Sequence, residues 1–154
     1  MSTRQTRTFV SILIFVLAVM VISEGFATEK RVTKRDYRFF SGTWINEEYN
    51  SRYRYAKLIM YPDGTWDGYN RTSDTGKDLS GNYEVVEKWI DSEGNIWYKT
   101  HIWEGTKVEG QPGQYELDKF SNSGKVWEYL GLRGDFPTEI DENHPRYYIY
   151  YRQE

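Results

Sequence analysis

The sequence predicts an all-β fold, an eight-stranded antiparallel up-and-down barrel that follows a cleaved signal peptide. Three observations carry this prediction. Aromatic residues make up 18% of the chain, with 14 Tyr and 6 Trp, and such side chains favour strands and bury large areas. Short runs of alternating polarity recur along the chain, separated by glycine-containing turn sequences. No stretch shows a long apolar pattern at helical spacing.

The N-terminal segment has the parts of a secretory signal peptide. Arg4 and Arg7 give a basic start, and an uncharged apolar run covers residues 9–22. Small residues at Gly25 and Ala27 then fit a signal peptidase site, so we expect residues 1–27 to be removed and the protein to be secreted or periplasmic. An uncleaved membrane anchor is the alternative, although the apolar run is shorter than the roughly 20 residues that span a bilayer.

The mature chain divides into a charged leader, residues 28–40, of which we expect residues 28–38 to be solvated, and a barrel domain, residues 41–154. Cleavage removes two arginines and one glutamate, so the net charge of −3 becomes −4. This mild acidity argues against a nucleic-acid partner, and no transmembrane segment is expected in the mature chain. The chain has no cysteine, so its stability must come from the core without disulfides.

Eight strands are expected in the barrel domain, joined mostly by tight hairpins. A sheet of this length with one apolar face closes on itself, which removes its edges. At most one short helix or turn is expected, within 133–146. The predicted strands cover residues 42–49, 55–61, 65–71, 81–90, 96–103, 113–120, 126–132 and 147–152.

The turn Tyr61-Pro62-Asp63-Gly64-Thr65 sets the register of the second and third strands. Proline fixes φ at the first turn position, and Gly64 can take a positive φ. Pairing Tyr61 with Thr65 places an uncharged set of side chains on one face, which must therefore point inward. The inward residues predicted by this alternation are Ala56, Leu58, Met60, Trp66, Gly68, Tyr83, Val85, Trp89, Ile96, Tyr98, Thr100, Ile102, Trp127 and Tyr129.

The first and last strands carry a resemblance to a known superfamily. Gly42-Thr43-Trp44 opens the first strand, and Tyr151-Arg152 ends the last. This pattern resembles the calycin signature of lipocalins, avidins and fatty-acid-binding proteins, and above all small bacterial exported lipocalin-like domains. The resemblance implies that the indole of Trp44 lies at the closed end of the barrel and that a cationic residue near the last strand packs across it.

The avidin branch matches less well. Asn46 corresponds to the asparagine that contacts biotin in that family, but the expected serine is replaced by Asn50, and Arg71 stands where a second serine is expected. Biotin binding is therefore not predicted, although Asn46 remains a candidate polar anchor.

No catalytic, metal or cofactor motif is present. The chain has no cysteine nucleophile, and its two histidines, His101 and His144, lack the short spacing of a local metal motif. We therefore expect a binding protein and not an enzyme, with a small, largely apolar ligand in the barrel interior. The residues predicted to line the ligand site are Trp44 as its floor, Asn46, Leu58, Met60, Trp66, Tyr83, Val85, Tyr98 and Trp127.

A second hypothesis stays open. In it the aromatic side chains fill the barrel, no cavity remains, and outward Tyr69, Trp97 and Trp103 form a patch for a protein or carbohydrate partner. The presence of a cavity decides between the two hypotheses, because a carrier needs a void of about 300 Å³ or more.

Overall fold

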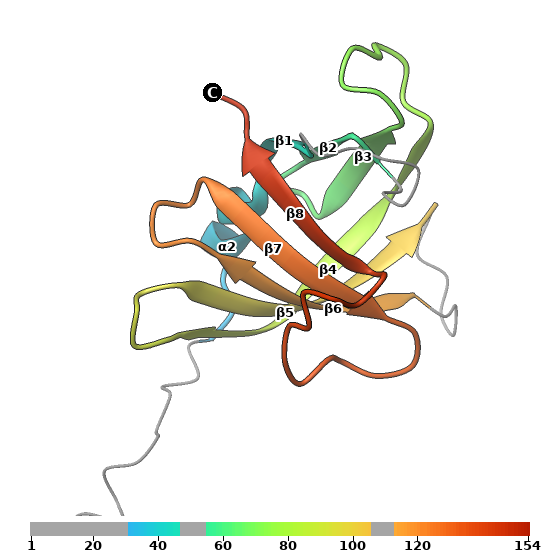
Figure 1. The fold of residues 1–154 in the computed structure, drawn as a ribbon. Coiled ribbons are helices and arrows are strands. Elements are labelled where there is room, and N and C mark those ends of the chain that lie inside the picture. The colour runs from blue at the N-terminus through green and yellow to red at the C-terminus, as the bar shows by residue number, and fades with distance from the viewer. Residues whose placement is uncertain (1–30, 47–54, 106–112) are drawn as a thin grey trace, which may run out of the picture.

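The computed structural model describes residues 31–46, 55–105 and 113–154, which form a β-barrel with a short helix at one end (Figure 1). The predicted signal peptide, residues 1–27, lies outside the described residues, as does Asn50. The elements are α2 (Lys34–Phe40), β1 (Gly42–Ile45), β2 (Lys57–Met60), β3 (Thr65–Tyr69), β4 (Leu79–Ile90), β5 (Ile96–Glu104), β6 (Gln114–Phe120), β7 (Val126–Leu132) and β8 (Tyr147–Arg152).

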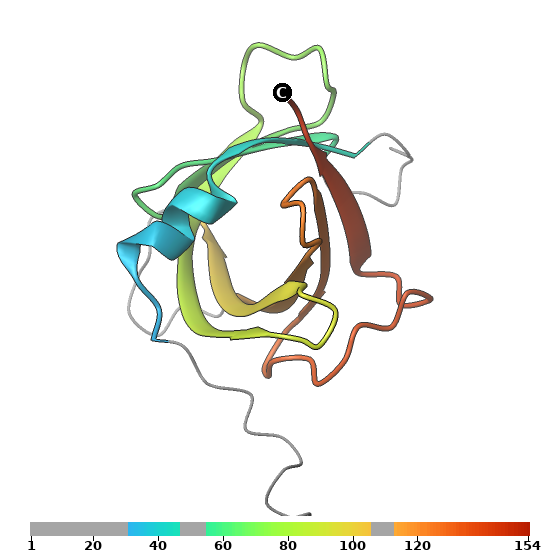
Figure 2. The same ribbon diagram turned by 90° about the vertical axis from the view of Figure 1, so that its left-hand side faces the viewer.

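Each strand pairs antiparallel with the next, and β8 pairs with β1, so the sheet closes. Seen along the barrel, the strands form a ring, with α2 at one side of it (Figure 2). The predicted fold, an all-β eight-stranded up-and-down barrel, is confirmed, and the strands lie within a few residues of their expected positions.

The hairpin turns set the register as the sequence predicts. The amide of Tyr61 donates to the carbonyl of Thr65 at 2.9 Å, and Gly64 has a φ of +87°, which only glycine adopts without strain. Met60 therefore pairs with Trp66. The turns that join β4 to β5 and β6 to β7 likewise contain glycines with positive φ, Gly94 and Gly124.

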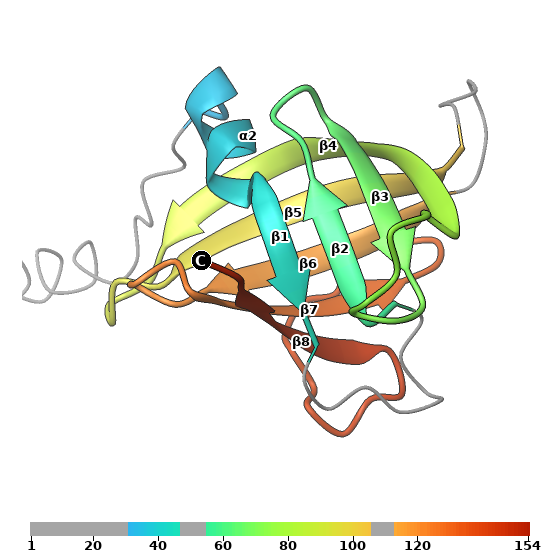
Figure 3. The same cartoon turned by 90° about the horizontal axis from the view of Figure 1, so that it is seen from above.

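The described part of the charged leader, residues 31–40, is not simply solvated, which corrects the expectation of a solvated segment there. Its last part forms α2, which Thr33 and Asp36 start with a reciprocal capping box. Phe40 is buried against the barrel core, and Asp36 is buried too. In Figure 3 the helix lies at the end of the barrel that carries the C-terminus. Within the described part of the chain, no helix has the length and apolarity needed to cross a membrane.

A β-bulge in β4 corrects the predicted orientation of Trp89. The register shifts between Val85 and Glu87, because Val86 is an extra, exposed residue. Every residue after the bulge changes face, so Lys88 points toward the core and Trp89 lies on the outside, where its ring stacks on Trp97 at 5.8 Å.

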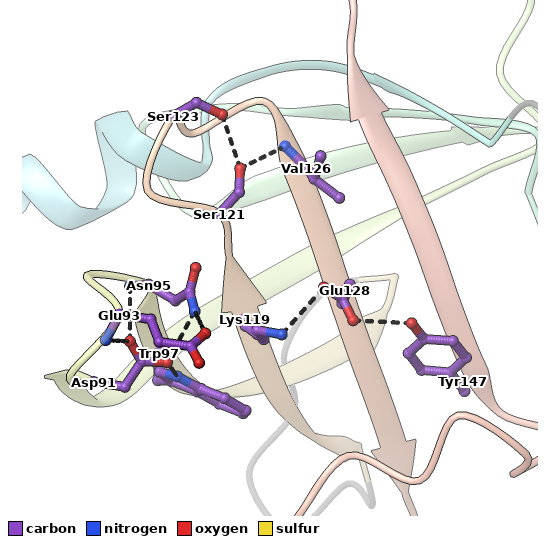
Figure 4. Close-up of polar contacts among 10 residues, drawn as sticks. All are labelled: Asp91, Glu93, Asn95, Trp97, Lys119, Ser121, Ser123, Val126, Glu128 and Tyr147. Atoms are coloured by element: carbon purple, nitrogen blue, oxygen red, sulfur yellow. Dashed lines mark hydrogen bonds and ion pairs between the residues drawn. The ribbon is translucent and has the colours of Figure 1, made fainter.

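The outer face of β5 to β8 carries polar contacts and one covered apolar patch. Figure 4 shows Glu128 between Lys119 and Tyr147, and the indole of Trp97 donating to Asp91. Leu117 and Leu130 pair on this same face and are buried, which explains why leucines share a face with Glu128. The connection 133–146 consists of turns and bends, one of the two forms expected there, and packs Phe136 edge-on against the outward Tyr115.

Candidate functional site

The two ends of the barrel differ in how they are filled. The end beside α2 is closed by packed aromatic rings, including Phe40, Trp44, Tyr98 and Phe120. At the opposite end the barrel contains a cavity of about 510 Å³. This volume lies within the range of small-molecule sites, about 300–1,000 Å³. The open end is therefore the candidate binding site.

The cavity walls combine aromatic and aliphatic side chains with polar groups in comparable measure. Leu58 from β2, Trp66 from β3 and Trp127 from β7 form its inner part, and all three are buried. The indole nitrogen of Trp66 donates to the carbonyl of Trp103 at 3.1 Å, which holds the ring against the wall. The other apolar and aromatic lining residues are Tyr55, Ile102, Trp103, Tyr129 and Tyr148.

A pair of buried carboxyl groups lies on β6, inside the barrel. The strand alternates so that Glu116 and Asp118 point inward, and Glu116 lines the cavity. Thr100 on β5 contacts both: its hydroxyl oxygen lies 2.7 Å from Asp118 Oδ2 and 3.4 Å from Glu116 Oε2. A hydroxyl has one proton to donate, so a proton on Glu116 can satisfy the second contact by donating to Thr100.

Two further donors hold the carboxyl pair in place. The side-chain amide of Gln114 donates to Glu116 Oε1 at 2.6 Å. The indole of Trp127 donates to Asp118 Oδ1 at 2.8 Å. Among the described residues, neither carboxyl group forms an ion pair with lysine, arginine or histidine.

Burial is the main cause of the raised pKa values of this pair. It raises the pKa of Asp118 to about 7, although hydrogen bonds from Thr100 and Trp127 oppose the rise. Burial also raises the pKa of Glu116 well above its usual value, and the negative charge of Asp118 adds to the effect. The pair therefore keeps a proton near neutral pH.

Two arginines lie toward the mouth of the cavity. Arg133 and Arg146 come from the β7–β8 connection; Arg133 is exposed and Arg146 half-buried. Glu104 at the end of β5 is exposed and lines the cavity as well, so the site runs from a carboxyl group inside, past aromatic walls, to charged groups of both signs. Among the described residues, no three His, Asp or Glu side chains are grouped closely enough to hold a metal ion.

The predicted site residues divide between the two ends. Leu58, Trp66 and Trp127 line the cavity. Asn46 is buried but does not line it, and its side-chain nitrogen has no hydrogen-bond partner among the described residues. The other predicted residues belong to the packed core and do not line the cavity: Trp44, Met60, Tyr83, Val85 and Tyr98. Whether any of the nine binds a ligand stays a prediction.

Trp44 lies beneath the cavity, one layer of side chains deeper. Its ring packs against Trp127, a cavity residue, with 5.5 Å between the ring centroids. Its indole nitrogen donates to the carbonyl of Phe40 at 2.8 Å. The guanidinium of Arg152 lies 4.4 Å from its ring centroid, so the expected cationic partner is in place.

The outward aromatic residues do not form the patch of the second hypothesis. Trp103 and Tyr69 are buried, and only Trp97 of the three is partly exposed. Lys57 covers the ring of Tyr69 at 4.2 Å.

Sequence reasoning missed the carboxyl pair, although one signal was available. Trp127 was predicted to point inward, and the Ser121–Lys125 turn pairs Phe120 with it. Counting back by two from Phe120 places Asp118 and Glu116 on the same inward face.

Comparison with known proteins gives no relative for this chain: no family model, no curated protein and no solved structure matches it.

Proposed function

We propose that this protein is an exported, calycin-like binding protein that holds a small ligand with a largely apolar body at the open end of its barrel. The observation that carries the proposal is the cavity of about 510 Å³ walled by Leu58, Trp66 and Trp127. Aromatic and aliphatic walls in this cavity can hold the body of a ligand, and the polar groups that line it can fix the ligand's orientation.

The closed end supports the calycin assignment. Arg152 crosses the Trp44 ring and donates to the carbonyl oxygens of Phe39, Ser41 and Gly124. A Cβ atom at Gly42 would lie 3.1 Å from Arg152 Nη1, and the φ of this residue is +135°. The glycine of the Gly-x-Trp sequence therefore leaves room for the arginine that covers the tryptophan.

Export is the second part of the proposal. The basic start, the apolar run 9–22 and the small residues at Gly25 and Ala27 support a cleaved signal peptide. N-terminal sequencing of exported protein should begin at Thr28, and a sequence beginning at Met1 would favour an anchored form.

A cavity-filling variant tests the binding site. Ile102 lines the cavity from β5, so Ile102→Trp should abolish binding of the neutral dye Nile red, measured by its fluorescence. Ile149→Trp is the matched control, because Ile149 pairs with the outward Glu128 on β8. Binding that survives in Ile102→Trp, with both variants folded by circular dichroism, would place the dye elsewhere and reject the site.

A further inference from the structure

We propose that the ligand is a protonated organic amine whose ammonium group contacts Glu116 inside the barrel, with its body between the aromatic walls. This inference deepens the proposed function and rests on it, because it assigns a ligand class to the same cavity.

The first argument is the position and chemistry of Glu116. Its side chain is buried, with 3% of the residue exposed, and lines the cavity from β6. An ammonium group entering the cavity favours the ionised form of Glu116, so the proton that the pair holds in the free protein is released. The carboxylate then accepts about four hydrogen bonds, and among the described residues only Gln114 donates to it at short distance, 2.6 Å. Thr100 lies farther away, at 3.4 Å, and gives its shorter contact to Asp118. Glu116 therefore has acceptor sites left for a donor that enters the cavity.

The second argument is the charge of the barrel interior. Asp118 lies behind Glu116 and shares Thr100 with it, and no described cation pairs with either group. A ligand that entered with a carboxylate foremost would bring a third acidic group to this buried space, so it would have to bind a further proton or place like charges close together. An ammonium group supplies the opposite charge and three donors, and suits the same space.

The third argument is the wall around the carboxyl group. Trp127 and Tyr129 lie beside each other on the inward face of β7, with 5.0 Å between their ring centroids, and both line the cavity. Tyr55 and Trp66 line it from the other side, 5.7 Å apart. Aromatic faces attract organic cations, most strongly where water is excluded.

The charged rim residues, Arg133, Arg146 and Glu104, are compatible with a ligand whose amine end lies inside the barrel. Arg133 is exposed, so water and salt screen its repulsion of a passing cation. Arg146 lies at the mouth, where its charge suits an acceptor at the outer end of the ligand. The amine end is therefore expected inside and any acceptor end outside.

Isothermal titration calorimetry with matched pairs of probes tests the inference on the full mature chain. One pair has an aromatic body, tryptamine and indole-3-propionate; the other has an aliphatic body, octylamine and octanoate. Each amine should bind roughly tenfold or more tightly than its carboxylate partner, because only the amine forms a buried ion pair. If neither amine binds more tightly than its carboxylate, the inference is overturned.

Two variants test whether the amine binds at Glu116. Glu116→Gln should weaken binding of the preferred amine by roughly tenfold or more, whereas the matched outer-face variant Glu84→Gln should leave it unchanged. Undiminished amine binding in Glu116→Gln would also overturn the inference.

Nile red distinguishes this failure from failure of the proposed function. If the dye binds in the cavity and the amines show no preference, the binding function stands and the ligand class is wrong. If neither dye nor amine binds to the folded wild-type protein, both proposals are rejected.

Discussion

The closed and open halves of this barrel are built from the same strands but differ in whether their buried charged groups have partners. At the closed end, Lys88 pairs with the carboxyl of Asp36, and Arg152 donates to three carbonyl oxygens. At the open end, Glu116 and Asp118 lie beside a cavity without a described cationic partner. A buried carboxyl group without a cation costs stability, and its position beside a cavity is the reason for proposing that it contacts a ligand.

The largest expected effect is at the closed end. Trp44 is fully buried among aromatic rings, so Trp44→Ala should lower the free energy of unfolding by about 3–5 kcal/mol, the usual cost of deleting a large buried aromatic side chain. Chemical denaturation monitored by circular dichroism measures the loss. A loss under about 1 kcal/mol would mean that the closed half is not the stability centre of the barrel.

The next effect concerns the ion pair between α2 and β4. Lys88→Met leaves the buried Asp36 carboxyl with hydrogen bonds from Thr33 and Tyr98 but without its cation, which should cost about 2–3 kcal/mol. Lys99→Met is the matched control on β5, because its pair with Glu87 is about one-third exposed and should contribute under about 1 kcal/mol. If the two variants lost the same free energy of unfolding, the Lys88–Asp36 pair would not be what fixes the helix to the barrel.

The buried carboxyl pair of the open half should make the stability of the protein depend on pH. The pKa of Asp118 is raised to about 7 and that of Glu116 lies well above its usual value, so the folded state binds protons that the unfolded state has lost. The free energy of unfolding should therefore fall as pH rises from about 4 through 7, by about 2 kcal/mol between pH 5 and pH 7 for the free protein. Denaturation at a series of pH values measures it.

Asp118→Asn provides the control for this pH effect, since it removes the titrating group and keeps a similar shape. The variant should show a flatter profile than wild type over the same pH interval. The closed half contributes the opposite slope below about pH 4: hydrogen bonds from Lys88 and Thr33 hold the pKa of Asp36 below 3.8, although burial pushes it upward. A wild-type profile that is flat from pH 5 to 7 would contradict the protonated carboxyl pair.

The smallest expected effect tests Arg152. Arg152→Lys keeps the positive charge over Trp44 but cannot reach all three carbonyl oxygens, so we expect a loss of about 1 kcal/mol. Thermal or chemical denaturation measures it. A loss as large as that of Trp44→Ala would show that the guanidinium, and not the indole, holds the closed end together.

The strands were predictable from the sequence because their turns are explicit. The Pro62-Asp63-Gly64 turn fixed one register, and alternation then placed Leu58, Met60 and Trp66 correctly on the inner face. Alternation failed after Val85, because a bulge changes the face of every later residue in β4 and has no clear sequence signal there.

The helix and the carboxyl pair were missed for different physical reasons. The helix α2 has seven residues, too few to show an apolar period, and its stability comes from the burial of Phe40 and the pairing of Asp36 with Lys88. Glu116 and Asp118 resemble solvated residues on a strand whose other face carries Leu117, and that face is covered only by tertiary contacts. The cavity itself depends on how the rings pack, which no local pattern encodes.

The central claim is that the open half holds a ligand while the closed half is packed solid. Native mass spectrometry of protein purified from its own source tests this claim most directly, because the complex is weighed intact and then after unfolding. The account predicts a one-to-one complex that loses a small basic molecule when the protein unfolds. A single species at the mass of the bare chain, unchanged by unfolding, would contradict it.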